Sequence, residues 1–164
     1  MSNAIRKVIA VSAIAFAASA ATLPALAADE YNVSGGLTAA GAPLAVHGVD
    51  PVAFVNTGNR SAGTAAYTEV YDGAAYYFNS AQNRDAFKKN PKKYMPQNGG
   101  FCTFGVSVGK KFDGNPRYAA VVDNKLYLFL NEEIYNAFQK DRKGTIKKAK
   151  ANWKKIRSTA ATDL

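Results

Sequence analysis

The sequence predicts an α+β fold: a single compact domain of two ββα-like repeats with antiparallel strands, followed by a C-terminal helix. The first observation is an internal repeat, because residues 47–89 and 98–140 align at an offset of 51 without a gap and share twelve identical residues in 43 positions. Chance would supply about three. The second observation is that each copy holds two β-prone runs, a turn signal and a helix signal. Neither copy can bury its aromatic face alone, so we expect them to pack about a pseudo-twofold axis.

Residues 1–27 have the features of a signal peptide and are not expected to join the fold. Arg6 and Lys7 supply a positive n-region, residues 8–21 are an apolar run, and residues 25–27 (Ala-Leu-Ala) form a small-x-small cleavage site. The run is short for a bilayer span, so the processed chain is predicted to be periplasmic or secreted, with no transmembrane segment. Loss of the two cations lowers the net charge from +9 to +7. Export argues against nucleic acid as the partner of the remaining basic residues.

The elements of the first copy follow a lead-in segment at residues 28–43 and open a domain predicted over residues 44–158. The apolar run at residues 52–55 predicts a short strand. Residues 67–71 and 75–78 predict a hairpin, because the Asp-Gly pair between them readily takes the positive φ angles of a two-residue turn. Ser80 is typical of a helix N-cap, so a helix is expected from there to about Asn90.

The second copy repeats this order with different residues. Residues 117–122 and 125–130 are predicted to pair across an Asp-Asn turn, and Asn131 to cap the next helix. A final helix is predicted over residues 145–157, since four apolar side chains recur on one face: Ile146, Ala149, Trp153 and Ile156. Its many lysines predict a solvated face, with weak contact to an anionic surface as the functional alternative.

Three side chains with metal-ligand chemistry lie in the segments that open or join the two copies. His47 and Cys102 are the only residues of their kinds, and Met95 is the only methionine after processing. Thiolate, imidazole and thioether together suit copper(I) or another soft metal. A pseudo-twofold axis would bring the two segments together, so the sequence predicts a metal site at Cys102, His47 and Met95, with copper as the expected ion.

Two other hypotheses remain open. Cys102 can serve as a nucleophile or redox thiol, with His47 raising the thiolate fraction and Asp50 orienting the imidazole. Alternatively, Tyr76 and Tyr127 can line a pocket for a small organic ligand. Each side chain also has a purely structural explanation, because Cys102 can be a small buried hydrophobe, Asp50 a turn cap and the tyrosines core residues. No phosphate loop, Cys-x-x-Cys, His-Glu-x-x-His or Gly-x-Ser-x-Gly motif occurs, so catalysis is not indicated.

Several motifs resemble a known family. The segments that carry the resemblance are residues 76–80 (Tyr-Tyr-Phe-Asn-Ser), 83–87 (Asn-Arg-Asp-Ala-Phe) and 90–94 (Asn-Pro-Lys-Lys-Tyr), which resemble the YHS domain. With residues 48–54 (Gly-Val-Asp-Pro-Val-Ala-Phe) and 99–102 (Gly-Gly-Phe-Cys), the chain resembles exported YHS-domain proteins of Gram-negative bacteria.

The resemblance implies a small domain linked to metal handling, because YHS modules accompany copper-transporting ATPases. Metal-associated modules of the family carry Cys-Ser-x-x-Cys, whereas residues 79–83 here are Asn-Ser-Ala-Gln-Asn, so both thiols are missing. Cys102 matches the Gly-Gly-aromatic-Cys of the exported branch. The sequence thus predicts a protein that binds copper or another soft metal through Cys102 and His47. A thiol-dependent enzyme and a module that binds a small organic ligand are the alternatives.

Overall fold

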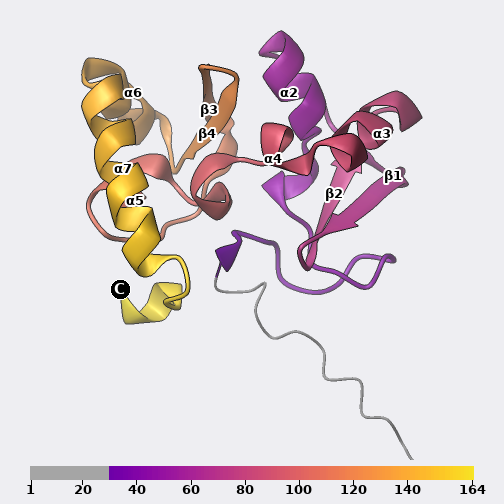
Figure 1. Ribbon diagram of the computed structural model, residues 1–164, viewed down its shortest axis with the longest axis horizontal. Helices are drawn as coiled ribbons and strands as arrows, with labels where there is room; N and C mark the ends of the chain where they lie inside the picture. Colours follow the sequence, from indigo (N-terminus) through magenta and orange to yellow (C-terminus); the bar gives the residue numbers. More distant parts are fainter. Residues whose placement is uncertain (1–29) are drawn as a thin grey trace, which may run out of the picture.

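A computed structural model describes residues 30–164, and the predicted signal peptide lies outside them (Figure 1). The first half of the fold holds, in chain order, η1 (Val46–Gly48), α2 (Pro51–Thr57), β1 (Thr64–Tyr71), β2 (Ala74–Phe78), α3 (Ala81–Lys89) and α4 (Pro91–Tyr94). The second half holds η2 (Gln97–Gly100), α5 (Thr103–Ser107), β3 (Asn115–Val122), β4 (Lys125–Phe129), α6 (Glu132–Lys140), α7 (Arg142–Ile156) and η3 (Ala161–Asp163). Helices and two small antiparallel sheets confirm the predicted α+β class.

The two hairpins, β1–β2 and β3–β4, occupy equivalent places in the chain. Both strands of the second hairpin, and helix α6 after it, begin 51 positions after their counterparts. The register of the first hairpin shifts between Thr64 and Thr68, and that of the second shifts between Asn115 and Ala119, again 51 positions on. The offset of these elements equals the offset of the sequence repeat. The pseudo-twofold axis stays a prediction.

Both hairpins turn through residues with positive φ, as the sequence predicts. Asp72 and Asp123 each have φ of 50°, and they are followed by Gly73 at 79° and Asn124 at 57°. Two consecutive left-handed residues form the tight turn whose twist matches the flanking strands. Each turn therefore presents an aspartate carboxylate at the tip of its hairpin.

The helices α3 and α6 pack an aromatic ring against each hairpin. The side chain of Ser80 caps α3 and that of Asn131 caps α6. Phe87 then stacks on Tyr76 with ring centroids 4.7 Å apart, while in the second half the corresponding phenylalanine, Phe138, stacks on a strand phenylalanine at 4.4 Å. Such offset aromatic pairs stabilise a core beyond the area that they bury.

The prediction of a strand at residues 52–55 is wrong, because these residues lie in helix α2. The Asp50 carboxylate caps the first turn, Pro51 supplies the fixed φ of the first helical position, and Gly58 ends the helix at φ of 71°. The final helix is also longer than predicted, since the Asp141 side chain caps it and α7 begins at Arg142.

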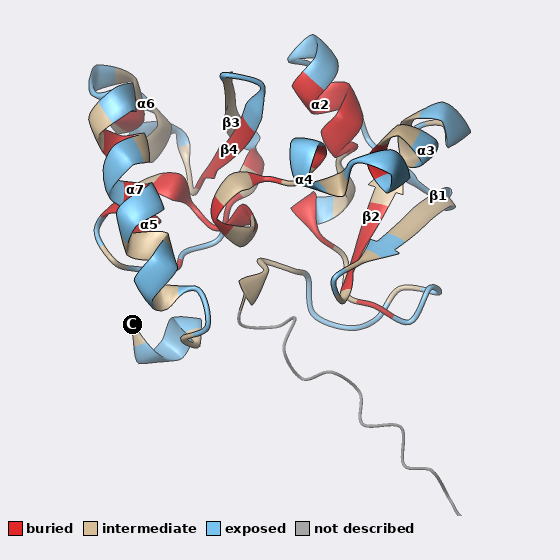
Figure 2. Ribbon diagram, viewed as in Figure 1, coloured by how far each residue is buried: buried red, intermediate tan, exposed pale blue. Residues whose placement is uncertain are grey.

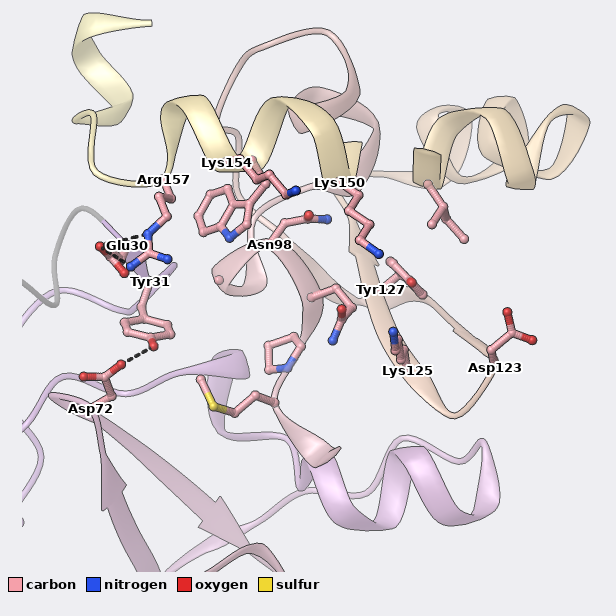
Figure 3. A pocket seen from close by; sticks show the side chains of 16 residues that line it. Glu30, Tyr31, Asp72, Asn98, Asp123, Lys125, Tyr127, Lys150, Lys154 and Arg157 are labelled. Atoms are coloured by element: carbon pink, nitrogen blue, oxygen red, sulfur yellow. Dashed lines mark hydrogen bonds and ion pairs between the residues drawn. The ribbon is translucent and has the colours of Figure 1, made fainter. Parts of the chain in front are cut away.

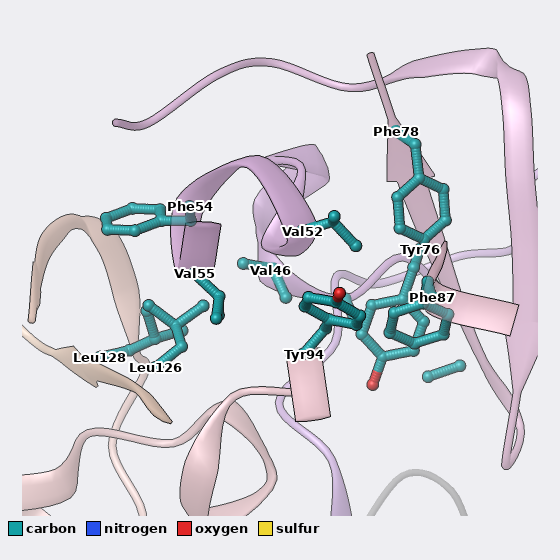
Figure 4. Close-up of a cluster of buried hydrophobic side chains, with 12 residues drawn as sticks. Val46, Val52, Phe54, Val55, Tyr76, Phe78, Phe87, Tyr94, Leu126 and Leu128 are labelled. Carbon is teal, nitrogen blue, oxygen red and sulfur yellow. The ribbon is translucent and has the colours of Figure 1, made fainter. Parts of the chain in front are cut away.

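The core joins the two halves. Its first cluster takes side chains from α2, β2, α3 and α4, and it includes Leu126 and Leu128 of β4, which lie beside α2 in Figure 4. Figure 2 shows buried residues concentrated in α2, β2 and β4. A second cluster gathers Cys102, Tyr127, Phe129 and Phe138. Because strand β4 contributes to both clusters, neither half has a core of its own.

Helix α7 packs along α5 and is fixed at its C-terminal end. Lys111, which is buried, donates from Nζ to the carbonyl oxygens of Arg157 at 2.8 Å and Thr159 at 2.5 Å. Its ammonium also lies 5.4 Å from the centre of the Trp153 ring. A cation at the C-terminal end of a helix interacts favourably with the helix dipole. Within residues 30–164, no helix is both long and apolar enough to span a bilayer.

Candidate functional site

A cleft of about 570 Å³ is lined by residues of the first half, the second half and α7 (Figure 3). This volume lies within the range of small-molecule sites. Its lining comes from the N-terminal segment, both hairpin turns, the segment at residues 95–99 and α7: Glu30, Tyr31, Asp72, Met95, Pro96, Gln97, Asn98, Gly99, Asp123, Lys125, Tyr127, Ile146, Lys150, Trp153, Lys154 and Arg157.

Residues 30–32 form a segment that we call the N-terminal strap, and its first two residues, Glu30 and Tyr31, line one side of the cleft. Glu30 Oε1 lies 3.3 Å from Arg157 Nη2 on α7. The Tyr31 hydroxyl donates to the Asp72 carboxylate at 2.5 Å, and Asn32 N donates to the carbonyl oxygen of Gly99 at 2.8 Å. The strap thus contacts the first hairpin, the segment before α5 and the end of α7. Burial, followed by the hydrogen bond to Asp72, raises the pKa of Tyr31, so its hydroxyl stays protonated.

The opposite wall is positively charged. Lys150 and Lys154 lie one helical turn apart on α7, and Lys125 begins strand β4. Among the described residues, no carboxylate lies within ion-pair distance of these three ammonium groups. In Figure 3 the side chains of Lys125 and Lys150 lie beside Tyr127. Three cations in one cleft that pair with no carboxylate of residues 30–164 favour a negatively charged ligand.

Aromatic and apolar side chains line the space between these walls. Tyr127 is 7% exposed, and burial, with a smaller contribution from the Asp123 charge, raises the pKa of its hydroxyl. Trp153 is half-buried and packs on Phe101 at 6.1 Å between ring centroids. Met95 is half-buried and also packs on the first core cluster. A mixed aromatic and cationic lining suits an organic molecule better than a bare ion.

The structure gives Asp50 a structural role. The residue is 0% exposed, and its carboxylate accepts from Val52 N at 2.8 Å and Ala53 N at 2.9 Å in α2. It also accepts from Asn79 N at 2.9 Å and Asn83 Nδ2 at 2.7 Å. These four bonds satisfy the buried charge and join α2 to the start of α3.

Cys102 is 1% exposed within the second core cluster, and its Sγ accepts from Gly105 N at 3.5 Å as the cap of α5. Burial raises the pKa of the thiol, while the N–H groups of Gly105, Leu130 and Phe104 act in the opposite direction. Because burial dominates, the thiol stays protonated at neutral pH, and a protonated thiol is a poor nucleophile.

His47 lies at the surface, with its side chain 39% exposed. Its Nε2 lies 2.9 Å from Asp113 Oδ1, and the same oxygen accepts from Asn32 Nδ2 at 2.8 Å. Its backbone is left-handed, with φ of 49°, like that of Asn98 at 55° in the second half. The imidazole therefore faces the loop before β3.

The predicted site residues fall into different surroundings. Met95 and Tyr127 line the cleft, Cys102 and Tyr127 share the second core cluster, and Tyr76 is 1% exposed in the first. Among residues 30–164, no group of three or more histidine, cysteine, aspartate or glutamate side chains is placed to hold a metal ion. The metal site at Cys102, His47 and Met95 stays a prediction.

Sequence reasoning missed two parts of the cleft. The strap falls in the predicted lead-in segment, and the lysines of α7 fall on the predicted solvated face. Arg157 and Glu30 are 127 positions apart, so no local pattern brings them together. The signal in the sequence is the composition of the final helix, because a strongly basic helix with apolar side chains on one face packs that face against another part of the chain.

The comparison with protein families agrees with the resemblance seen in the motifs. Residues 54–98 match the YHS domain family, a family often associated with metal binding, copper in particular. The match runs from α2 to η2 and includes Met95 and Asn98 of the cleft. No curated protein and no solved structure is similar enough to count as a match. The first half of this chain is therefore similar to a YHS domain.

Proposed function

We propose that the protein is a non-enzymatic binding module, exported to the periplasm, that holds a small organic ligand in the cleft. The observation that carries this proposal is the lining, in which Tyr127 and Trp153 lie next to lysines that pair with no carboxylate of residues 30–164. Polar groups that converge beside aromatic side chains fix the orientation of a ligand in small-molecule sites. The buried, protonated Cys102 thiol favours binding over thiol catalysis.

The cleft contains a built-in reporter of binding. Trp153 is the only tryptophan of the chain and lines the cleft. A ligand that enters should change its fluorescence in a saturable way, and amide NMR shifts should concentrate at Lys125, Lys150 and Trp153. A screen of small organic fragments at millimolar concentration tests this. Shifts that map instead to α3, or no saturable response to any fragment, would contradict the proposal.

A soft-metal site that uses Cys102 and His47 is the second candidate function. One observation favours it beyond the family match: Cys102 N donates to the Phe112 carbonyl oxygen at 2.9 Å, and His47 bonds to the next residue, Asp113. The backbone of Cys102 and the imidazole of His47 therefore bond to consecutive residues, and thiolate with imidazole suits copper(I).

Competition against a copper(I) chelator tests this second candidate. Cys102→Ser and His47→Gln should each weaken copper affinity at least tenfold, whereas Lys148→Gln, an exposed change on α7, should leave it unchanged. Equal affinity in all variants would exclude these two residues as ligands. Copper binding with an unchanged Trp153 signal would separate this site from the cleft.

The proposed export can be tested by determining where the chain is cleaved. Cleavage after Ala27 should give a periplasmic protein whose N-terminal residue is Ala28, as found by N-terminal sequencing of a periplasmic fraction. The exposed lysines of α7, such as Lys147 and Lys148, additionally allow weak contact with an anionic surface. Salt-sensitive retention on anionic vesicles, absent on neutral ones, would be the sign of that contact.

A further inference from the structure

The two halves differ at their hairpin turns. In the first half, the Tyr31 hydroxyl bonds to the turn carboxylate of Asp72. Burial is the main cause of the raised pKa of Tyr76 on strand β2 of this hairpin, and the charges of Tyr31 and Asp72 contribute less. The counterparts of Asp72 and Tyr76, 51 positions on, are Asp123 and Tyr127, and both line the open cleft. The strap therefore occupies a position beside the first hairpin. We call the corresponding position beside the second hairpin, which is part of the cleft, the open place.

The open place is suited to an aromatic ring. Tyr127 and Trp153 bring aromatic faces to the cleft, and Ile146 and Met95 add apolar surface. Tyr31 shows which group this fold accepts beside such a turn: a phenol whose hydroxyl donates to the turn aspartate. A ligand ring beside Tyr127 would have the same kind of acceptor in Asp123.

The charged side chains around the open place indicate which charge the ligand carries in addition to its ring. Lys125, Lys150 and Lys154 line it, while the fourth cation of the cleft, Arg157, is already paired with Glu30. Of the other two carboxylates in the lining, Asp72 accepts from the Tyr31 hydroxyl, and neither it nor Asp123 has an ion pair among the described residues. The four cations of the lining therefore outnumber its three carboxylates by one. The excess of cations favours a ligand that carries an anionic group in addition to its ring.

We propose that the open half of the cleft binds a small hydroxyaromatic acid. The ring lies beside Tyr127, the hydroxyl donates to Asp123, and the carboxylate is held by the ammonium groups of α7 and Lys125. This inference rests on the proposed function, since it names the ligand class of the same cleft. It does not depend on a metal.

Three related probes separate the contributions of the hydroxyl and of the carboxylate. The first is 4-hydroxyphenylacetate, the second is phenylacetate, which lacks the hydroxyl, and the third is 4-hydroxyphenylacetamide, which lacks the charge. Titration of the processed protein, followed by Trp153 fluorescence and calorimetry, should show the first binding at least tenfold more tightly than the amide. Phenylacetate should bind several-fold more weakly than the first probe, because Asp123 then loses its donor.

A pair of matched double variants locates the charge effect. The change Lys150→Gln with Lys154→Gln should weaken binding of 4-hydroxyphenylacetate at least tenfold and remove the preference over the amide. The control, Lys147→Gln with Lys148→Gln, removes the same charge from exposed positions of the same helix that do not line the cleft. It should change affinity less than twofold at 150 mM salt, because charges farther from the ligand than about 8 Å, the Debye length, are largely screened.

The outcomes separate this inference from the function on which it rests. Equal binding of acid and amide, or equal loss in both double variants, would overturn the ligand class. If neutral fragments change the Trp153 fluorescence and the acid does not, the proposed ligand class is also overturned. The cleft would then still be a binding site. Absence of any saturable ligand in the cleft would overturn the proposed function itself.

Discussion

Asp50 and Cys102 hold the same position in their two halves. Asp50 N donates to the carbonyl oxygen of Ser61, and Cys102 N donates to that of Phe112, which is 51 positions after Ser61. Both side chains cap the helix that follows. The offset between the two caps is 52, so one extra residue precedes α5, and the ungapped alignment conceals it. A carboxylate in one half and a thiol in the other thus perform one structural task.

Replacing Asp50 by alanine should destabilise the fold by about 3 kcal/mol or more, since four charge-assisted bonds are lost and buried donors are left unpaired. Urea unfolding measures the effect. Asp85→Ala is the matched control, because that carboxylate is exposed and, within residues 30–164, its ion pair is with its neighbour Arg84. The control should cost less than about 0.5 kcal/mol. Equal losses in both variants would show that the Asp50 network contributes nothing.

The raised pKa of Cys102 predicts how stability depends on pH. Above about 8.5, the ordinary thiol pKa, the unfolded chain loses a proton that the folded protein keeps. The contribution of this group is therefore complete below pH 8.5 and is lost as the pH rises further. Cys102→Ser keeps a cap without that titration, so its unfolding free energy should fall less steeply between pH 8.5 and 10. Identical slopes in both proteins would contradict the prediction.

At the scale of elements, the hairpins and α3 follow from the sequence, whereas α2 does not. The signals for the hairpins are local: an Asp-Gly or Asp-Asn turn between β-prone runs. A four-residue apolar run at residues 52–55 fits a buried strand and a buried helix equally well by periodicity. The deciding signal was Asp50-Pro51, a cap followed by the residue preferred at the first helical position. Interpreting that pair as a turn led to the wrong element.

The residue before each hairpin is a glycine that lies very close to the backbone of another segment. A Cβ on Gly114 would overlap the carbonyl oxygen of Gly100 and lie 2.9 Å from Leu128 Cβ, and one on Gly63 would overlap the backbone of Tyr77. Gly114→Ala and Gly63→Ala should each cost about 1–3 kcal/mol or more, because backbone cannot move aside as a side chain can. Thermal unfolding should show lower midpoints in both.

Gly35 supplies the control for these glycine changes. A Cβ there meets nothing within 4 Å, so Gly35→Ala should leave the midpoint within about 2 °C of the parent. A large loss at Gly35, or none at Gly114, would show that the close approach is not what limits stability.

At the scale of the molecule, the cleft exists because distant segments meet across the two halves. The sequence placed Met95 and Tyr127 in candidate sites, and both line the cleft. It could not place Tyr31 or Lys150, because their positions depend on how the strap and α7 pack on the rest. Local propensity determines elements, but a site between them depends on packing across more than 100 residues of chain.

The strap offers a last test of how the cleft is built. Tyr31→Ala removes the phenol beside Asp72 and should cost roughly 2 kcal/mol, less than a fully buried ring would. The space left should accept 4-methylphenol, the side chain of tyrosine as a free molecule, because cavities made by removing a side chain can bind small aromatic molecules. Millimolar 4-methylphenol should therefore raise the melting temperature of Tyr31→Ala by several degrees more than that of the parent. Tyr31→Phe, which keeps the ring, should respond like the parent, and an equal rise in all three proteins would show that Tyr31 does not occupy a ligand-like place.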